Sequence, residues 1–287
     1  MFKKRYHDHI NWRKEASLLP GYIIVTLWVA FGAVIMAWIL GASLSTAPEI
    51  YQGKVFKFES GIHFDNYVRA WQAQNVSVFF ANSLLYATCA SALVLLIAAP
   101  AAYVLSRFNF KANHLLKTSV IIAMSGPEIM IVMPLFATAT RAGMKGRLLL
   151  IILYTLLKVP YTTVYLLRFF ETLSHTYEEA AAIDGCPPAK TFWKIMLPLV
   201  QPAVVTVTIF NFLGVWNEFF LALIFASSSD MAPVGVGLMN IVNGMKYTGD
   251  LGGLFAGVVI VFLPTFLLYI FMSEKIIVGI TGGGIKG

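Results

Sequence analysis

The feature that most constrains this chain is a series of apolar runs that are long enough to cross a lipid bilayer. They lie at about residues 22–44, 80–105, 116–139, 148–167, 203–225 and 254–272. A membrane-spanning helix needs about 20 such residues, because it must cross a hydrocarbon core of roughly 30 Å. Lipid offers the backbone no hydrogen-bond partner, and the runs lack the alternation of β-barrel strands, so each is expected to be a helix. The sequence therefore predicts an all-α integral membrane protein with six transmembrane helices.

The composition agrees with this prediction. Apolar residues make up 58% of the 287 residues and charged residues only 12%, whereas soluble domains carry about 25% charged residues. In a soluble protein the net charge of +7 would suggest nucleic-acid binding. Here the basic residues flank apolar runs, which is the pattern that orients membrane proteins. We therefore expect lipid, and no nucleic acid, around the chain.

Lysine and arginine also predict which side of the membrane each segment faces. They are more frequent on the side of the N-terminus, and the cytoplasmic side carries such an excess, so both termini are expected in the cytoplasm. The first apolar run is longer than the core of a signal peptide and is expected to remain as a span. The predicted segments are a cytoplasmic N-terminus 1–17, a first helix 18–45, a periplasmic segment 46–76, a five-helix core 77–273 with a cytoplasmic loop 171–200, and a cytoplasmic tail 274–287.

No pattern in the sequence is typical of an enzyme. Cys89 lies in a span and Cys186 in a polar loop, so no disulfide is expected. The histidines show no metal-binding spacing, and we assign no metal site and no catalytic residue. A phosphate-binding loop of the form G-x-x-x-x-G-K-[ST] is missing as well. The chain itself is therefore expected to bind neither ATP nor another cofactor.

The long cytoplasmic loop has a readable local structure. Thr176 and Glu179 have the spacing of a helix capping box, and the alanines that follow favour helix. Gly185 fits the left-handed position that ends a helix, and the prolines at 187–188 prevent its continuation. A second short helix is expected to begin near Ala189. The loop is therefore predicted to be a helix, a bend at glycine and another helix.

Three apolar residues in this loop, Phe192, Trp193 and Ile195, have no obvious cover in the chain. An exposed apolar patch usually marks a protein contact. An amphipathic segment that lies on the bilayer surface would show the same pattern. The residues alone leave both interpretations open.

The spacing of this loop resembles a known motif. Glu179-Ala180-Ala181, then three residues, Gly185, nine residues and Ile195-x-Leu197-Pro198 match the EAA loop of permease subunits in bacterial ABC importers. Other segments resemble the carbohydrate branch of that family, and they are Phe64–Tyr67, Asn82–Leu84, Ala101–Tyr103, Arg107–Phe108, Pro127–Glu128 and Trp216–Phe219. Over most of its length the chain is similar to the smaller permease of maltose-type importers.

The resemblance implies a type I ABC importer fold in the bacterial inner membrane. It also implies a second permease, two cytoplasmic ATPases that bind ATP and Mg, and a substrate-binding protein on the outer side. The short helix after Gly185 would dock on an ATPase. The residues implied in docking are Glu179, Ala180, Ala181, Gly185, Phe192, Ile195, Leu197 and Pro198, and a weaker likeness implies an ATPase contact by the tail residues Gly284, Ile285 and Lys286.

Four polar residues at apparent membrane depth are candidates for the translocation pathway, namely Glu128, Lys158, Asn217 and Glu218. An ionisable residue there costs about 2.5–3.5 kcal/mol and usually faces an aqueous cavity or the bundle interior. Hydrogen bonding between helices is the competing explanation for Asn217 and for Asn211. Lys158 could also pair with Glu128.

Several alternatives remain at this stage. A permease for another solute, an intramembrane enzyme and a secondary transporter are the other classes considered, although the sequence shows neither converging catalytic groups nor inverted repeats. The basic segment 141–147 and Lys158 also raise the hypothesis of an acidic cargo, such as a uronate oligosaccharide of the alginate type.

Overall fold

The computed structural model describes residues 12–72, 76–226 and 228–282. The tail residues Gly284, Ile285 and Lys286 lie outside the described residues. Across these ranges the chain forms helices and no strands. The elements are α1 (Trp12–Ser43), α2 (Ala47–Tyr51), α3 (Asp65–Gln72), α4 (Val76–Arg107), α5 (Asn113–Ser125), α6 (Glu128–Arg141), α7 (Arg147–Thr172), α8 (Thr176–Ile183), α9 (Pro188–Thr191), the π-helical turn η2 (Phe192–Met196), α10 (Leu197–Leu199), α11 (Gln201–Trp216), α12 (Phe220–Phe225), the 3₁₀ turn η3 (Ser229–Met231), α13 (Val234–Thr248) and α14 (Leu251–Gly282).

The described helices include four that are long and apolar enough to cross a membrane, and these are Ser17–Ser43, Val76–Arg107, Arg147–Thr172 and Leu251–Ser273. Two bent helix pairs raise the number of spans to as many as six. One pair is α5 with α6, which meet at 100°, and the other joins Pro188–Leu199 to α11 at 80°. The predicted all-α fold is confirmed, and the predicted six spans lie within the range of four to six that these helices allow.

The predicted fifth span, 203–225, is divided into α11 and α12 by a break at Asn217–Phe219. The third span is broken at only one of its two prolines. Pro127 follows Gly126, and a residue before proline is pushed out of the helical conformation, so α5 ends there. Pro134 lies inside α6, where it removes a single backbone hydrogen bond without ending the helix.

The core of the bundle is the long contact between α4 and α7, on which α11 also packs. Small buried residues line one side of α4, and they are Ala87, Ala90, Ala98, Ala99 and Ala102. Small side chains let helix backbones approach closely, which favours helix association in lipid. This pair therefore forms a rigid frame for the loop at one end and for a cavity along its length.

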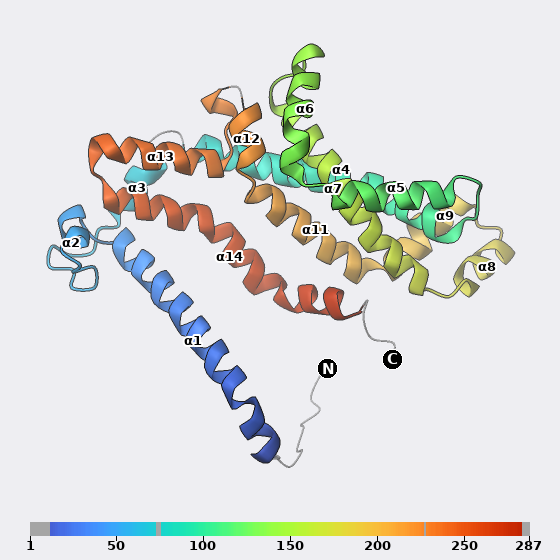
Figure 1. The fold of residues 1–287 in the computed structure, drawn as a ribbon, viewed down its shortest axis with the longest axis horizontal. Helices are drawn as coiled ribbons and strands as arrows, with labels where there is room; N and C mark the ends of the chain where they lie inside the picture. The colour runs from blue at the N-terminus through green and yellow to red at the C-terminus, as the bar shows by residue number, and fades with distance from the viewer. Residues whose placement is uncertain (1–11, 73–75, 227, 283–287) are drawn as a thin grey trace.

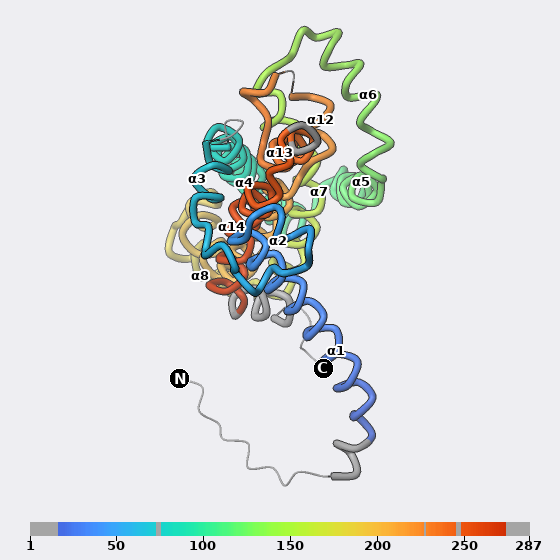
Figure 2. The backbone as a smooth tube through the Cα atoms, turned by 90° about the vertical axis from the view of Figure 1, so that its left-hand side faces the viewer, coloured from blue at the N-terminus to red at the C-terminus, as the bar shows by residue number. Residues whose placement is uncertain are grey.

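The first helix stands apart from this frame. None of the most apolar stretch of α1 is buried inside the chain (0%), and its main contact is with α14. Figures 1 and 2 show α1 projecting away from the other helices, with α6 projecting elsewhere. Figure 1 also places α2 and α3 at one end of the bundle and α8 and α9 at the opposite end.

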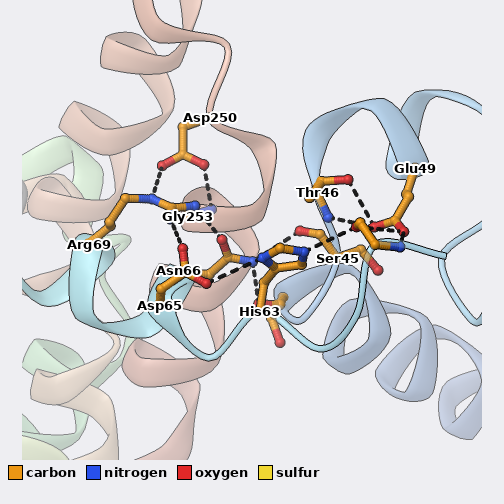
Figure 3. Close-up of polar contacts among 11 residues, drawn as sticks. Ser45, Thr46, Glu49, His63, Asp65, Asn66, Arg69, Asp250 and Gly253 are labelled. Atoms are coloured by element: carbon orange, nitrogen blue, oxygen red, sulfur yellow. Dashed lines mark hydrogen bonds and ion pairs between the residues drawn. The ribbon is translucent and has the colours of Figure 1, made fainter. Parts of the chain in front are cut away.

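The segment between α1 and α4 is a packed unit rather than a loose loop (Figure 3). The Asn66 Nδ2 amide donates to the carbonyl oxygens of Ser43 (2.9 Å) and Ser45 (3.0 Å). Arg69 forms an ion pair with Asp65 and contacts Asp250 at the start of α14, with Nε to Oδ2 at 3.4 Å. These contacts tie the segment to the ends of two spans.

Glu49 predicts how this unit responds to acid. Its carboxylate accepts hydrogen bonds from the Thr46 and Ser60 backbone N–H groups at 2.8 and 2.9 Å, and these bonds lower the pKa of Glu49 from 4.5 to about 2. A depressed pKa stabilises the fold above the unfolded value, and this contribution disappears as pH falls from about 4.5 toward 2. Thermal unfolding measured against pH should show that loss in the wild type. The Glu49→Gln variant should be less stable at neutral pH and flatter over the same window, and equal slopes would contradict this account.

Candidate functional sites: the loop 171–200 and a cavity among the helices

The loop begins with helix α8, which has the predicted extent but not the predicted cap. Its N-cap residue is His175, whose side chain makes no capping hydrogen bond. Thr176 is therefore already inside the helix, and its hydroxyl lies 2.8 Å from that of Ser174. Ser174 Oγ accepts the Thr176 N–H at 3.2 Å. The expected capping box is wrong, because the helix begins one residue too early for Thr176 to serve as its cap.

The bend after α8 is as predicted. Gly185 has φ +70°, a conformation that glycine adopts without strain. The Gly185 N–H donates to the Ala182 carbonyl at 3.0 Å and the Cys186 N–H to the Ala181 carbonyl at 2.8 Å. This pair of bonds is the Schellman ending, which satisfies carbonyls that the helix leaves free. The bend is therefore defined by backbone geometry.

The segment after the bend returns into the protein core. Phe192 is only 5% exposed, and its ring lies 5.1 Å from that of Tyr103 on α4, centroid to centroid. Met196 is fully buried, and both side chains belong to a core cluster that also contains Phe170 of α7. The expectation that Phe192 is uncovered is wrong, because α4 and α7 supply the aromatic surface that covers it.

The apolar groups that the loop does expose come mainly from α8. Ile183 is 86% exposed, Tyr177 46% and Trp193, in η2, 50%. Glu179 and Ala180 are exposed too, whereas Ala181 is buried. Among the other predicted docking residues, Pro198 is exposed and Ile195 and Leu197 are half-buried. The residues predicted to dock therefore divide into an exposed set and an anchoring set.

A buried ion pair, which sequence reasoning missed, joins the loop to the transmembrane core. The Arg107 guanidinium, at the end of α4, places Nε 3.2 Å from Glu178 Oε1. Its Nη2 donates to the Leu173 carbonyl at 2.8 Å, and the side chains of Arg107 and Glu178 are 4% and 19% exposed. Arg107 was part of the family resemblance, and Glu178 directly precedes the Glu-Ala-Ala motif. The sequence could not predict that they pair, because they lie far apart along the chain.

A cavity of about 480 Å³ lies where α5 and α6 bend, against α7 and α11. Its lining includes Met124, Glu128, Ile131, Lys158, Tyr161 and Asn211. Lys158 Nζ donates to Glu128 Oε1 at 3.0 Å, so two of the three charged residues of the predicted pathway are brought together. The lining is apolar with a few polar groups, which is the usual character of a small-molecule site.

The remaining polar candidates have structural partners. Asn211 and Thr162 form a buried hydrogen bond between α11 and α7, with Nδ2 to Oγ1 at 2.9 Å, as the inter-helix explanation predicted. Asn217 ends α11 and donates to the Leu213 carbonyl at 2.9 Å. The Glu218 carboxylate accepts the Leu221 and Ala222 N–H groups at the start of α12, and the Tyr154 hydroxyl donates to it at 2.9 Å. Neither Asn217 nor Glu218 lines the cavity.

The segment before α13 is held against α4 by Asn82, another residue of the family resemblance. Asn82 Nδ2 donates to the Asp230 and Ala232 carbonyls at 2.7 and 3.0 Å. Arg147 contacts both sides of this junction, donating to Asn82 Oδ1 at 3.2 Å and to the Asp230 carbonyl at 2.8 Å. Arg147 therefore has a structural role at this junction.

The fold and the sites define a multi-pass membrane permease with a folded loop at one end and a cavity between broken helices. The description "binding-protein-dependent transport system inner membrane component" belongs to the family that matches residues 94–273. The chain belongs to this family and is a carbohydrate ABC importer permease, a non-catalytic membrane subunit. Permeases of this family work with a second permease, an ATPase and a substrate-binding protein.

Two relatives illustrate the range of this family. The chain is 32% identical to the diacetylchitobiose uptake system permease protein NgcG of Streptomyces coelicolor, over 91% of this chain and 87% of the relative. It is 31% identical to the sulfoquinovosyl glycerol transport system permease protein SmoH of Agrobacterium fabrum, over 93% of each. A bacterial ABC transporter involved in the import of the acidic polysaccharide alginate has the same fold, with a TM-score of 0.81, 20% identity and coverage of 93% of this chain and 98% of that one.

Proposed function

We propose that this chain forms half of the pathway of an ATP-driven saccharide importer and receives the motion of the ATPase through the loop 171–200. ATP and Mg would be bound by two ATPase subunits, and the chain would transmit movement without hydrolysing ATP. A contact of the tail residues Gly284, Ile285 and Lys286 with the ATPases is part of the same proposal. Both termini would then lie in the cytoplasm.

The observation that carries the proposal is the combination of exposure and anchoring in the loop. Ile183 presents a nearly bare apolar side chain, while Phe192 and the ion pair of Arg107 with Glu178 fix the loop to α4 and α7. A patch that is apolar and rigidly held suits a protein contact. A push on Ile183 would be passed to the helices that line the cavity, since packed elements move as bodies.

The projecting helix α1 supports a second permease as a partner. Its most apolar stretch has no cover inside the chain, so lipid and a neighbouring membrane subunit are the available contacts. A substrate-binding protein would dock at the opposite end from the loop, where the packed unit of α2 and α3 lies (Figure 1).

The cargo class is a saccharide, as the names of the relatives indicate, and these names include both an uncharged and an acidic cargo. The family match argues against the intramembrane enzyme and the secondary transporter, and the sugar permeases among the relatives argue against a permease for a non-sugar solute. An acidic, alginate-type cargo is supported by the printed name of the similar structure, although that likeness establishes the fold alone. The pairing of Lys158 with Glu128 and of Arg147 with Asp230 argues against it.

Replacing Gly185 tests the role of the bend. Nothing lies within 4 Å of a Cβ added there, so only its left-handed backbone resists substitution. Proline cannot adopt a positive φ, whereas asparagine tolerates this conformation. We expect Gly185→Pro to lower sugar uptake per ATP hydrolysed at least tenfold (about 1.4 kcal/mol of coupling) with the permease still in the membrane. Gly185→Asn should retain most coupling, and equal coupling in both variants would count against the proposed role.

A further inference from the structure

We propose that the cavity at the bend of α5 and α6 is electrically balanced and therefore passes uncharged saccharides in preference to acidic ones. This inference rests on the proposed function, because it assumes that the cavity belongs to the pathway. It specifies the cargo class through the two charged residues of the lining, Glu128 and Lys158.

The charges come from different helices and meet inside the cavity. Glu128 is the first residue of α6, directly after the break at Pro127, and Lys158 lies in the middle of α7. Their side chains are 51% and 25% exposed within the chain, with Nζ and Oε1 3.0 Å apart. Each therefore neutralises the other while remaining accessible from the cavity.

The cavity lining offers no second cation to an acidic sugar. Lys158 is the one basic residue among the lining residues, which all belong to the described part of the chain. Lys145 lines a different pocket, beside Phe136 and Phe225, and Arg147 pairs with Asp230. A carboxylate that approached Lys158 would meet Glu128 as well, and like charges a few ångströms apart repel each other.

The rest of the lining suits an uncharged sugar. Tyr161 is 39% exposed and lies one helical turn from Lys158, so its ring can pack on the apolar C–H face of a sugar. The pair can exchange hydrogen bonds with hydroxyl groups, which carry both a donor and an acceptor.

A thiol placed in the cavity can measure this balance directly. Met124 lines the cavity and is 42% exposed, so Met124→Cys provides the thiol, with Cys89 and Cys186 replaced by alanine. The complete importer in vesicles is treated with an anionic sulfonatoethyl or a cationic trimethylammonioethyl methanethiosulfonate. Each rate is divided by the rate of the same reagent with free mercaptoethanol, which removes intrinsic differences in reactivity.

With the pair intact, the two normalised rates should agree within about threefold. Glu128→Gln should favour the anionic reagent by about tenfold, and Lys158→Gln should favour the cationic reagent by a similar factor, as expected for one unbalanced charge at a few ångströms. The double variant Glu128→Gln/Lys158→Gln should restore the balance. It also serves as the control for folding, because it removes both charges together.

Three results would overturn the proposal. One is a tenfold preference for the anionic reagent with the pair intact, which would point to an acidic cargo. Another is a ratio of the anionic to the cationic rate that is the same in the single variants as with the pair intact. The third is a lack of reaction of the Met124→Cys thiol with either reagent. ATP-driven uptake of a neutral disaccharide is measured in the same vesicles. If uptake is lost while the ratio of the two rates stays unchanged, the proposed coupling through the loop is wrong. The proposed charge balance of the cavity is unaffected by that result.

Discussion

Replacing Ile183 by aspartate should release the ATPase from the membrane subunits. Ile183 is the most exposed large apolar side chain of the loop, at 86%. An apolar anchor at the centre of an interface is commonly worth about 2–4 kcal/mol, and an unpaired charge buried in its place adds a desolvation cost. We therefore expect at least a tenfold loss of the ATPase that co-purifies with the permease, since about 1.4 kcal/mol corresponds to a factor of ten.

The matched control places the same acid on the far end of the protein. Tyr51 is also a strongly exposed apolar residue, at 75%, and it lies in α2, at the opposite end of the bundle from α8 (Figure 1). Tyr51→Asp should leave ATPase attachment unchanged. Full attachment in Ile183→Asp, or an equal loss in both variants, would contradict docking at α8.

Replacing Arg107 by alanine should weaken the attachment of the loop to α4 and leave the exposed docking residues of α8 unchanged. The substitution leaves the Glu178 carboxylate, which is 19% exposed, without the guanidinium and with the ring of His175 beside it, whose Nδ1 lies 3.5 Å from Oε2. Breaking a buried pair costs about 3–5 kcal/mol, and the partial exposure of Glu178 places this case at about 3 kcal/mol. We expect a lower unfolding temperature and a loss of most sugar uptake per ATP hydrolysed.

Two further variants separate the ion pair from general effects of charge. The double variant Arg107→Met/Glu178→Leu removes both charges and should recover much of the stability, because apolar pairs can replace buried ion pairs. Arg168 forms an exposed ion pair with Glu171 on α7, and Arg168→Ala should cost less than about 1 kcal/mol. If Arg107→Ala were as mild as Arg168→Ala, the anchoring role would be wrong.

Local sequence chemistry was sufficient for most of the fold. Apolar runs predicted the spans because lipid requires long helices with internal hydrogen bonds. Gly185 predicted a bend because few other residues adopt its backbone conformation, and the observed φ of +70° confirms it. Pro127 breaks the third span for an equally local reason, its effect on the residue before it.

Contacts between distant residues were harder to predict. Phe192 looks exposed in the sequence, but its cover comes from Tyr103 and Phe170, which are far away along the chain. The ion pair of Arg107 with Glu178 has the same origin, since its distance is set by how α4 ends beside α8. Glu128 and Lys158 were an exception, because two charges at membrane depth have few alternatives to each other.

A photoreactive amino acid in place of Ile183 tests the central claim most directly. The variant is incorporated into the complete importer in membranes, irradiated, and the captured partner is identified by mass. The account predicts an adduct with the ATPase subunit, which weakens when the Gly185→Pro substitution is added. Capture of lipid alone would contradict it, because that result would mean that α8 lies on the bilayer surface and not in a cleft of the motor.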